Sequence, residues 1–184
     1  MFAVTKRLLL RPGWIEEAPA LTEAIADERI ARNTARMPWP YRLEDAEEYL
    51  AREPAADYPS FQIIDRTVDP VRMIGGIGFM DAEGAPELGY WIRPDSWGRG
   101  YATEAGRAAL AAARSSLGYS RIVAGHFVDN PASGRVLEKL GFRRTGRIEP
   151  RFSRARNRDV DCVMFELDEA EQLDQPDMTR SLAA

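Results

Sequence analysis

The sequence of 184 residues has very little cysteine, histidine and lysine, and it lacks long apolar runs. Its single cysteine, Cys162, excludes an internal disulfide framework and fits a cytoplasmic protein. No apolar stretch approaches the roughly 18 residues that a membrane-spanning helix needs, so we expect no membrane partner. The first residues place no apolar segment behind their charges, and we therefore expect no secretion signal.

Metal ligands are equally scarce. With one histidine, one cysteine and no spaced set of carboxylates, the sequence predicts no metal site. A net charge of −4 argues against nucleic acid as a partner. Only two of the 25 basic residues are lysines, which we attribute to GC-rich coding, so the abundance of arginine by itself indicates no function.

What is present has the composition of one globular domain, with 45% apolar and 29% charged residues. Hydrophobic periodicity predicts strands at about 6–11, 61–65, 73–80, 87–93, 121–128, 142–147 and 159–167, and helices at about 16–27, from 44, at 102–115 and at 131–140. The helix between two adjacent strands predicts a parallel pair. We expect an α/β domain of the α+β type over residues 1–168. It has a mixed, mostly antiparallel sheet of six to seven strands, about four helices, and a solvated or disordered tail at 169–184.

Two glycines stand one residue apart where a predicted strand gives way to a helix. Gly98-Arg99-Gly100 before a helix start lets several backbone N–H groups converge on an anion such as pyrophosphate. A glycine-rich turn without a ligand is the plainer alternative. The pattern is not a P-loop, because GxxxxGK[ST] is absent, and Thr103 replaces the third glycine of the dinucleotide fingerprint. A dinucleotide-dependent oxidoreductase is therefore a weak alternative.

A second motif, NPASGRVLEKLGF, covers residues 130–142. Asn130 and Ser133 flank the start of a predicted short helix, where each also suits a cap. Arg135 and Lys139 lie one helical turn apart and either share a phosphate or form a solvated basic face. Because one motif follows each strand of the predicted parallel pair, the two together favour a ligand site.

These segments resemble the GCN5-related N-acetyltransferases (GNAT), and within them the ribosomal-protein alanine N-acetyltransferases. The resemblance covers about residues 5–167 and is carried by KRLLLR (6–11), ELGYWI (87–92), WGRGYATEA (97–105) and NPASGRVLEKLGF. The GNAT loop is usually written [QR]xxGx[GA]; Gly100 and Ala102 match it, and Trp97 departs from it. The resemblance implies an acetyl-CoA site in a V-shaped opening between two parallel strands that splay apart, ending here at Arg93 and Val128.

The resemblance also implies roles for individual residues. The pantetheine arm would pair with the backbone of Trp91, Ile92 and Arg93, and Asn130 would hydrogen-bond it through its side-chain amide. Ser133 matches the family serine proposed to protonate the leaving thiolate. An N–H freed by a bulge near Trp91 or Ile92 would stabilise the oxyanion. The pyrophosphate would lie on the N–H groups of Gly98, Arg99, Gly100, Tyr101, Ala102 and Thr103.

A general base must deprotonate the attacking amine, and three residues are candidates. Glu87 opens the strand beside the expected thioester, and its family equivalent is often proposed as the base; the alternative is a solvent-facing strand residue. Glu83 lies nearby in the sequence. His126 is the one side chain that titrates near neutral pH when unperturbed. It shares a strand face with Ile122 and Ala124, so a buried core histidine is the competing interpretation.

The acceptor pocket is expected from the loop 37–41, the Trp14 region and the last two strands. Trp39 and Tyr41 either contact a ligand or anchor the loop. Seven arginines between residues 143 and 158 form either a docking surface or, as the coding bias favours, a solvated hairpin. A protein N-terminus, a polyamine, an amino acid and an antibiotic amine all stay open as acceptors, and so does a homodimer.

Taken together, these features predict an N-acetyltransferase that moves the acetyl group of acetyl-CoA to a primary amine in a ternary complex. The amine belongs to a protein N-terminus or to a small molecule. A non-catalytic acyl-CoA-binding sensor or interaction module on the same fold is the alternative.

Overall fold

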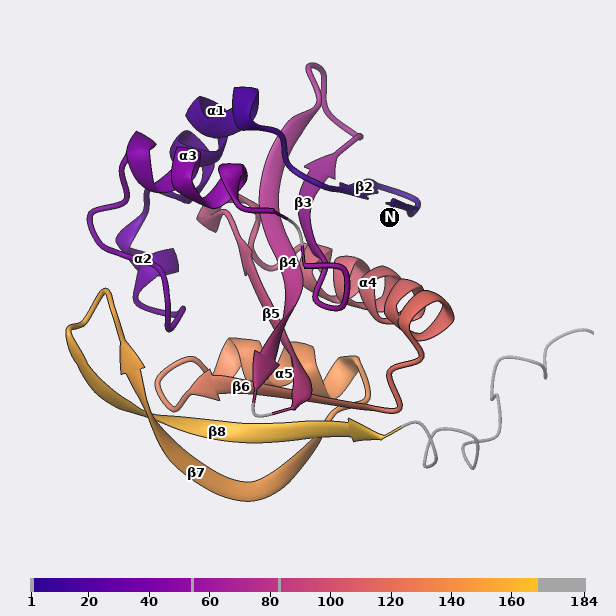
Figure 1. The fold of residues 1–184 in the computed structure, drawn as a ribbon, viewed down its shortest axis with the longest axis vertical. Helices are drawn as coiled ribbons and strands as arrows, with labels where there is room; N and C mark the ends of the chain where they lie inside the picture. Colours follow the sequence, from indigo (N-terminus) through magenta and orange to yellow (C-terminus); the bar gives the residue numbers. More distant parts are fainter. Residues whose placement is uncertain (1, 54, 83, 169–184) are drawn as a thin grey trace, which may run out of the picture.

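In the computed structural model, one mixed sheet of eight strands carries helices on both faces (Figure 1). The structure describes residues 2–53, 55–82 and 84–168. The strand order is β1-β2-β3-β4-β5-β6-β8-β7. The strands are β1 (Ala3–Val4), β2 (Leu8–Arg11), β3 (Ser60–Asp65), β4 (Arg72–Ala82), β5 (Ala85–Ile92), β6 (Arg121–Phe127), β7 (Arg143–Ser153) and β8 (Arg158–Asp168). The α-helices are α1 (Ala18–Ile25), α2 (Glu28–Ala31), α3 (Leu43–Ala51), α4 (Tyr101–Leu117) and α5 (Pro131–Lys139), and short 3-10 turns cover Ile15–Glu17 and Pro94–Ser96.

Two hydrophobic clusters lie on opposite faces of the sheet. The larger one packs α4 and α5 against the strands, and Gly106 of α4 is so close to Leu140 that an added Cβ would lie 2.6 Å from its Cδ1. The smaller one packs α1 and α3 against Ile64 and Met73. Figure 1 shows α1, α2 and α3 on one side of the central strands and α4 on the other.

The one parallel contact in the sheet is very short. Strands β5 and β6 are paired at a single position, Glu87 with Val123. Beyond it β5 continues alongside β4 as far as Ile92, while β6 continues alongside β8 as far as Phe127. The two strands therefore separate into a V-shaped opening in the middle of the sheet, as the GNAT resemblance implies.

The predicted fold class is confirmed, and the differences lie in short or peripheral elements. The sequence missed β1 and α2, which have two and four residues and are too short for a periodic pattern. The predicted strand at 142–147 is too short, since β7 continues through Pro150 to Ser153. Because β7 is an edge strand, a proline can occupy it without removing a hydrogen bond to a neighbouring strand.

Two predicted helix ends are confirmed by their caps. Gly118 follows α4 at φ +63°, and Gly141 follows α5 at φ +91°, both in the left-handed region that favours glycine. No helix in the described part of the chain is long and apolar enough to cross a membrane. The predicted tail at 169–184 and the candidate base Glu83 lie outside the described residues.

Candidate active site

The glycine-containing loop presents a row of unused backbone donors. Gly98 and Gly100 adopt φ values of +74° and +78°, which explains both glycines. Among the described residues, no backbone N–H from 98 to 103 has a hydrogen-bond acceptor, whereas the next one, of Glu104, bonds Gly100 O at 3.0 Å. The positive end of the α4 dipole lies at the same place, so the loop offers donors and a partial positive charge that suit an anion.

Side chains from the turn between β1 and β2 fix this loop. The Glu104 carboxylate accepts from Thr5 Oγ1 at 2.6 Å and from Arg7 Nε at 2.7 Å, and Arg7 Nη1 donates to Arg99 O at 3.0 Å. Burial raises the pKa of Glu104, but the hydrogen bonds from Thr5 and Arg7 outweigh it, so the pKa is lowered. Tyr101 OH donates to the buried Asp65 at 2.8 Å. The loop is thereby held in shape without a ligand.

The backbone of β5 that faces the opening belongs to Tyr90 and Ile92. Arg93 N–H donates to Ile74 O at 2.8 Å on the β4 side, and residues of an antiparallel strand alternate between their two neighbours. Trp91 and Arg93 therefore direct their backbone groups toward β4, contrary to the prediction. The backbone groups free to pair with a ligand in the opening are therefore those of Tyr90 and Ile92, and of the predicted residues only Ile92 is among them.

The oxyanion donor was expected from a bulge near Trp91 or Ile92. The register of β4 and β5 runs without a break from the pair Gly75–Ile92 to the pair Ala82–Ala85, so that bulge is absent. The free backbone groups come instead from the separation of β5 from β6. Trp97 Nε1 covers one of them, donating to Ile92 O at 2.7 Å.

The start of α5 borders the same opening. Asn130 caps the helix, its Oδ1 accepting from Ser133 N at 3.4 Å, which leaves its amide NH₂ available. Ser133 Oγ lies 2.7 Å from the hydroxyl of Tyr90, so these two side chains meet across the opening. Burial raises the pKa of Tyr90 to about 12, although its hydrogen bond to Ser133 acts in the opposite direction. Our sequence analysis assigned no role to Tyr90; its place on the same strand face as Leu88 and Ile92 was the available signal.

His126 is 7% exposed and lies between β6 and α5. Its Nδ1 lies 2.8 Å from Phe127 O, and because a carbonyl only accepts, Nδ1 carries the proton. Its Nε2 has no partner among the described residues and packs so closely on Gly134 that an added Cβ there would lie 2.6 Å away. The histidine is a core residue on the α5 face of the strand.

Glu87 lies at the apex of the opening, where β5 and β6 pair. Its side chain is 9% exposed and forms an ion pair with Arg151 of β7. Burial opposes the charge of Arg151, but the adjacent carboxylate outweighs it and raises the pKa of Arg151. The sequence missed Arg151, one of seven arginines in a hairpin that we expected to be solvated. Its contact lies 64 residues away along the chain, and no local pattern signals it.

Cys162 of β8 lies close to this ion pair. Its thiol is buried, and burial raises its pKa to about 11, with Glu87 and Glu149 adding to the effect and Arg151 opposing it. At neutral pH it is therefore a protonated thiol, which is a poor nucleophile. A cysteine-bound acyl intermediate is not what this environment favours.

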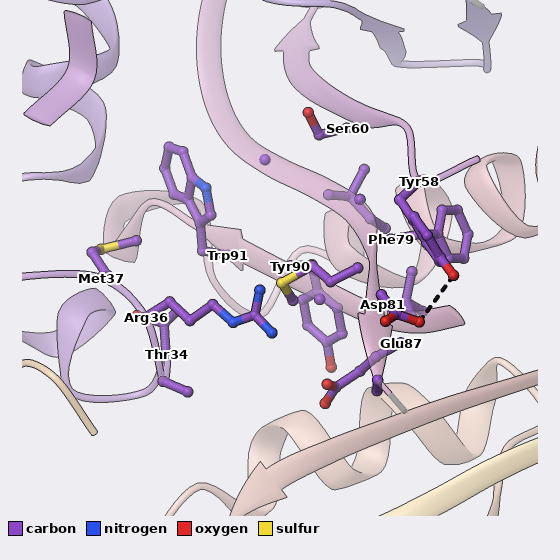
Figure 2. A pocket seen from close by; sticks show the side chains of 18 of the residues that line it. Thr34, Arg36, Met37, Tyr58, Ser60, Phe79, Asp81, Glu87, Tyr90 and Trp91 are labelled. Atoms are coloured by element: carbon purple, nitrogen blue, oxygen red, sulfur yellow. Dashed lines mark hydrogen bonds between the residues drawn. The ribbon is translucent and has the colours of Figure 1, made fainter. Parts of the chain in front are cut away.

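A cleft of about 1300 Å³ opens on the side of α1 and α3 and includes Glu87, Tyr90 and Ser133 in its lining (Figure 2). Its floor holds Gly76, Gly78 and Gly89, which explains glycines inside strands. A Cβ on Gly76 would lie 2.5 Å from Trp91 Nε1, and a Cβ on Gly78 would lie 2.9 Å from Ser60 Cα. These glycines let Trp91 lie on the sheet and keep the floor open.

The cleft is lined partly by the segments that the sequence indicated. Met37, Tyr41 and residues 149–152 line it, whereas Trp14 and Trp39 do not. Lys139 borders a separate hollow of about 730 Å³ beside the start of α4, which Arg135 does not reach. An acidic side chain caps the start of α3, since Asp45 accepts from Arg42 N at 2.9 Å.

Comparisons with known proteins agree with this arrangement. A family model described as the acetyltransferase (GNAT) domain matches residues 7–143. YoaA of Bacillus subtilis (strain 168), described as an uncharacterized N-acetyltransferase, is 32% identical over 153 residues, covering 77% of this chain and 82% of its own.

Solved structures share the fold as well. A GNAT-family acetyltransferase from Bacillus anthracis superposes with a TM-score of 0.78 at 26% identity, over 92% of this chain and 99% of that one. The ribosomal L7/L12 α-N-protein acetyltransferase RimL, solved with coenzyme A, shares the fold with a TM-score of 0.74 at 18% identity, over 91% and 98% of the two chains. The chain therefore belongs to the GNAT family of N-acetyltransferases, enzymes that use acetyl-CoA.

Proposed function

We propose that this enzyme transfers the acetyl group of acetyl-CoA to a primary amine by direct attack in a ternary complex, the amine belonging to a protein N-terminus or a small molecule. The position of Glu87 carries the proposal. Glu87 lies at the apex of the opening, where β5 and β6 pair, and it also lines the cleft. A thioester reached through the opening would face an amine in the cleft at this point.

The cofactor residues that we propose follow from the unused donors. The N–H groups of residues 98–103 would bind the pyrophosphate, and those of Tyr90 and Ile92 would pair with the pantetheine arm as an added strand. The amide NH₂ of Asn130 would reach the same arm. An N–H of β5 at the opening would also hydrogen-bond the oxyanion.

We assign the proton transfers to two sites. Glu87, held in place by Arg151, takes a proton from the amine as its nitrogen forms a bond with the thioester carbon. Ser133, bonded to Tyr90, donates a proton to the departing thiolate as the C–S bond breaks. His126 does not fit the role of base, because its protonated Nδ1 is bonded to Phe127 O and its Nε2 packs against Gly134.

A free buried thiol at Cys162 fits a reducing compartment such as the cytoplasm.

The test is a CoA-release assay of the purified protein with acetyl-CoA and a panel of peptides and small amines, with mass spectrometry to locate the added acetyl group. We expect release with at least one amine class and acetylation at its nitrogen. Calorimetric titration with acetyl-CoA runs in parallel. Binding without release from any amine would favour the acyl-CoA sensor, and absence of binding would overturn both functions.

A further inference from the structure

Two arginines that line the cleft have no acidic partner. Arg36 lies in the loop between α2 and α3, and Arg154 lies in the turn between β7 and β8. Neither forms an ion pair within the described residues. The other arginines of the lining are each neutralised by a carboxylate, in the pairs Arg52–Glu48, Arg121–Glu166, Arg147–Glu149 and Arg151–Glu87.

Main-chain contacts bring the two unpaired arginines together. Arg154 N donates to Ala35 O at 2.8 Å, so the residue that precedes Arg36 is bonded directly to Arg154. Arg156 Nε donates to Arg32 O, also at 2.8 Å, and ties the same two segments a second time. The loop and the hairpin are thus bonded to each other, and each contributes to the cleft lining an arginine that has no acidic partner.

The Arg36 side chain is directed into the cleft. Figure 2 shows it extending from its loop between Met37 and Thr34 toward Tyr90 and Glu87. A guanidinium presents a planar fork of N–H donors that matches a carboxylate, and here those donors contact no protein acceptor in the described chain. Acidic Asp81, which also lines the cleft, forms no ion pair with Arg36 in the described chain and accepts a hydrogen bond from Tyr58 OH at 3.0 Å.

We propose that the acceptor of the acetylation proposed above is a free amino acid, whose carboxylate binds Arg36, assisted by Arg154, while its amine lies at Glu87. The inference rests on that proposed function and narrows its substrate. The cleft then offers two cations without an acidic partner to the carboxylate and the acceptor oxygens of Glu87 to the amine, and Met37 and Trp91 offer apolar surface to the side chain. A polyamine would bring a second positive charge toward the arginines, and a peptide N-terminus has no carboxylate beside its amine.

The chemistry is the transfer already described. The amine nitrogen forms the amide bond to the acetyl carbon, the C–S bond breaks, and free CoA leaves as the thiol. The acceptor first loses one ammonium proton to solvent, and a second proton passes from its nitrogen to Glu87 as the amide bond forms. Ser133 gives its proton to the sulfur and takes one from the Tyr90 hydroxyl, 2.7 Å away. Solvent then reprotonates Tyr90 and accepts the proton held by Glu87. The carboxylate of the acceptor takes no part in bond making and serves only to position the amine.

The test compares L-amino acids with their own carboxamides and with tripeptides of the same N-terminal residue, in the CoA-release assay. We expect kcat/KM for the best amino acid to exceed that of its amide at least tenfold. Arg36→Gln should remove most of this preference by slowing the acid alone, and Arg154→Gln should remove part of it. Arg158→Gln, on the same hairpin but outside the cleft lining, is the matched control and should leave it unchanged.

The outcomes separate this inference from the function on which it rests. Equal rates with acids and amides, faster reaction with peptides, or an Arg36→Gln loss that is the same for acid and amide would overturn the inference and leave acetyl transfer standing. Release from no amine at all would overturn both. Acetyl-CoA affinity, measured by calorimetry, should be unchanged in all three variants.

Discussion

The two sides of the V-shaped opening are built from different parts of the chain. On the side of α4, donors come from the backbone of one continuous loop, residues 98–103. On the side of the cleft, the polar groups are side chains from three separate segments: the loop with Arg36, strand β5 with Glu87, and the β7–β8 hairpin with Arg151 and Arg154. One side is a local structure, and the other exists only when the whole sheet has formed.

This difference has a chemical consequence. Backbone N–H groups in a glycine-containing loop can bind any diphosphate. Their position depends on Gly98 and Gly100, which adopt positive φ angles, rather than on the identity of side chains. Side chains on separate segments can be exchanged one at a time without disturbing that loop. We infer that the loop binds acetyl-CoA, the acetyl donor that the family shares, and that the cleft determines which amine this enzyme acetylates.

The largest expected effect lies where the two sides meet. Glu87→Gln removes the proposed base and keeps an oxygen that accepts from Arg151, so we expect kcat to fall about 10²- to 10⁴-fold. The acetyl-CoA dissociation constant should stay within about threefold, because the loop donors are untouched. Stopped-assay CoA release and calorimetry measure the two quantities.

Glu149→Gln is the matched control for that substitution. Glu149 also lines the cleft and also acts electrostatically on Cys162 and Arg151, but it lies on β7, and its ion pair is with Arg147. Its kcat should change little. If Glu87→Gln retained a third of the wild-type kcat, or if Glu149→Gln were equally slow, Glu87 would not be the base.

A second substitution, Gly100→Ala, should disturb the acetyl-CoA loop and leave the cleft unchanged. Gly100→Ala forces a Cβ into a backbone with φ +78°, which costs about 1–2 kcal/mol and displaces the loop donors. We expect acetyl-CoA to bind about tenfold more weakly, while the preference among acceptors is unchanged. Calorimetry with acetyl-CoA and the acceptor panel at saturating acetyl-CoA measure the two effects.

Gly118→Ala offers the same strain at the other end of the same helix, with φ +63° and open space around it. It should lower the melting temperature as much as Gly100→Ala does and leave acetyl-CoA binding intact. Equal weakening of binding by both variants would attribute the effect to helix stability rather than to the loop.

The same contrast explains what could be predicted from the sequence. Gly98, Gly100 and Asn130 owe their positions to their immediate neighbours, so a motif is enough to place them. The pairing of Arg151 with Glu87 requires β7 and β5 to be positioned by the strands between them, and nothing near Arg151 signals it. Composition was misleading there, because the arginine-rich coding made the half-buried, paired Arg151 look like one of many arginines on the surface.

Strand alternation could have supplied part of what was missed. We expected the backbone of Trp91 and Arg93 to pair with the pantetheine arm, one residue away from Tyr90 and Ile92. The sequence does not show which β5 residues direct their backbone groups toward β4 and which toward the opening. The hydrogen bond from Arg93 N to Ile74 O decides it. Once this alternation is known, the backbone of Tyr90 is placed at the opening, and the strand pairing places the glycines at 76, 78 and 89 together on the cleft floor.

The smallest expected effect concerns Tyr90, which bridges the opening to Ser133. Tyr90→Phe should lower kcat only about threefold, because a thiolate with a free-thiol pKa of about 8.5 leaves with little protonation and Ser133 remains. The pH dependence of stability is the sharper readout. Below pH 10 the phenol is neutral whether the chain is folded or unfolded. Between its ordinary pKa of 10.0 and its folded-state pKa of about 12, only the unfolded chain ionises, so the free energy of unfolding falls as the pH rises.

Removing the phenol removes that part of the alkaline destabilisation. Urea denaturation at pH 9 and pH 11 should show the wild type losing about 1 kcal/mol more than Tyr90→Phe over this interval. Tyr49→Phe, at a tyrosine that is 41% exposed, is the control and should follow the wild type. If Tyr90→Phe lost stability as steeply as the wild type, the phenol would titrate as it does in water. The side chain would then not be enclosed between β5 and α5, and the two sides of the opening would not be joined at this point.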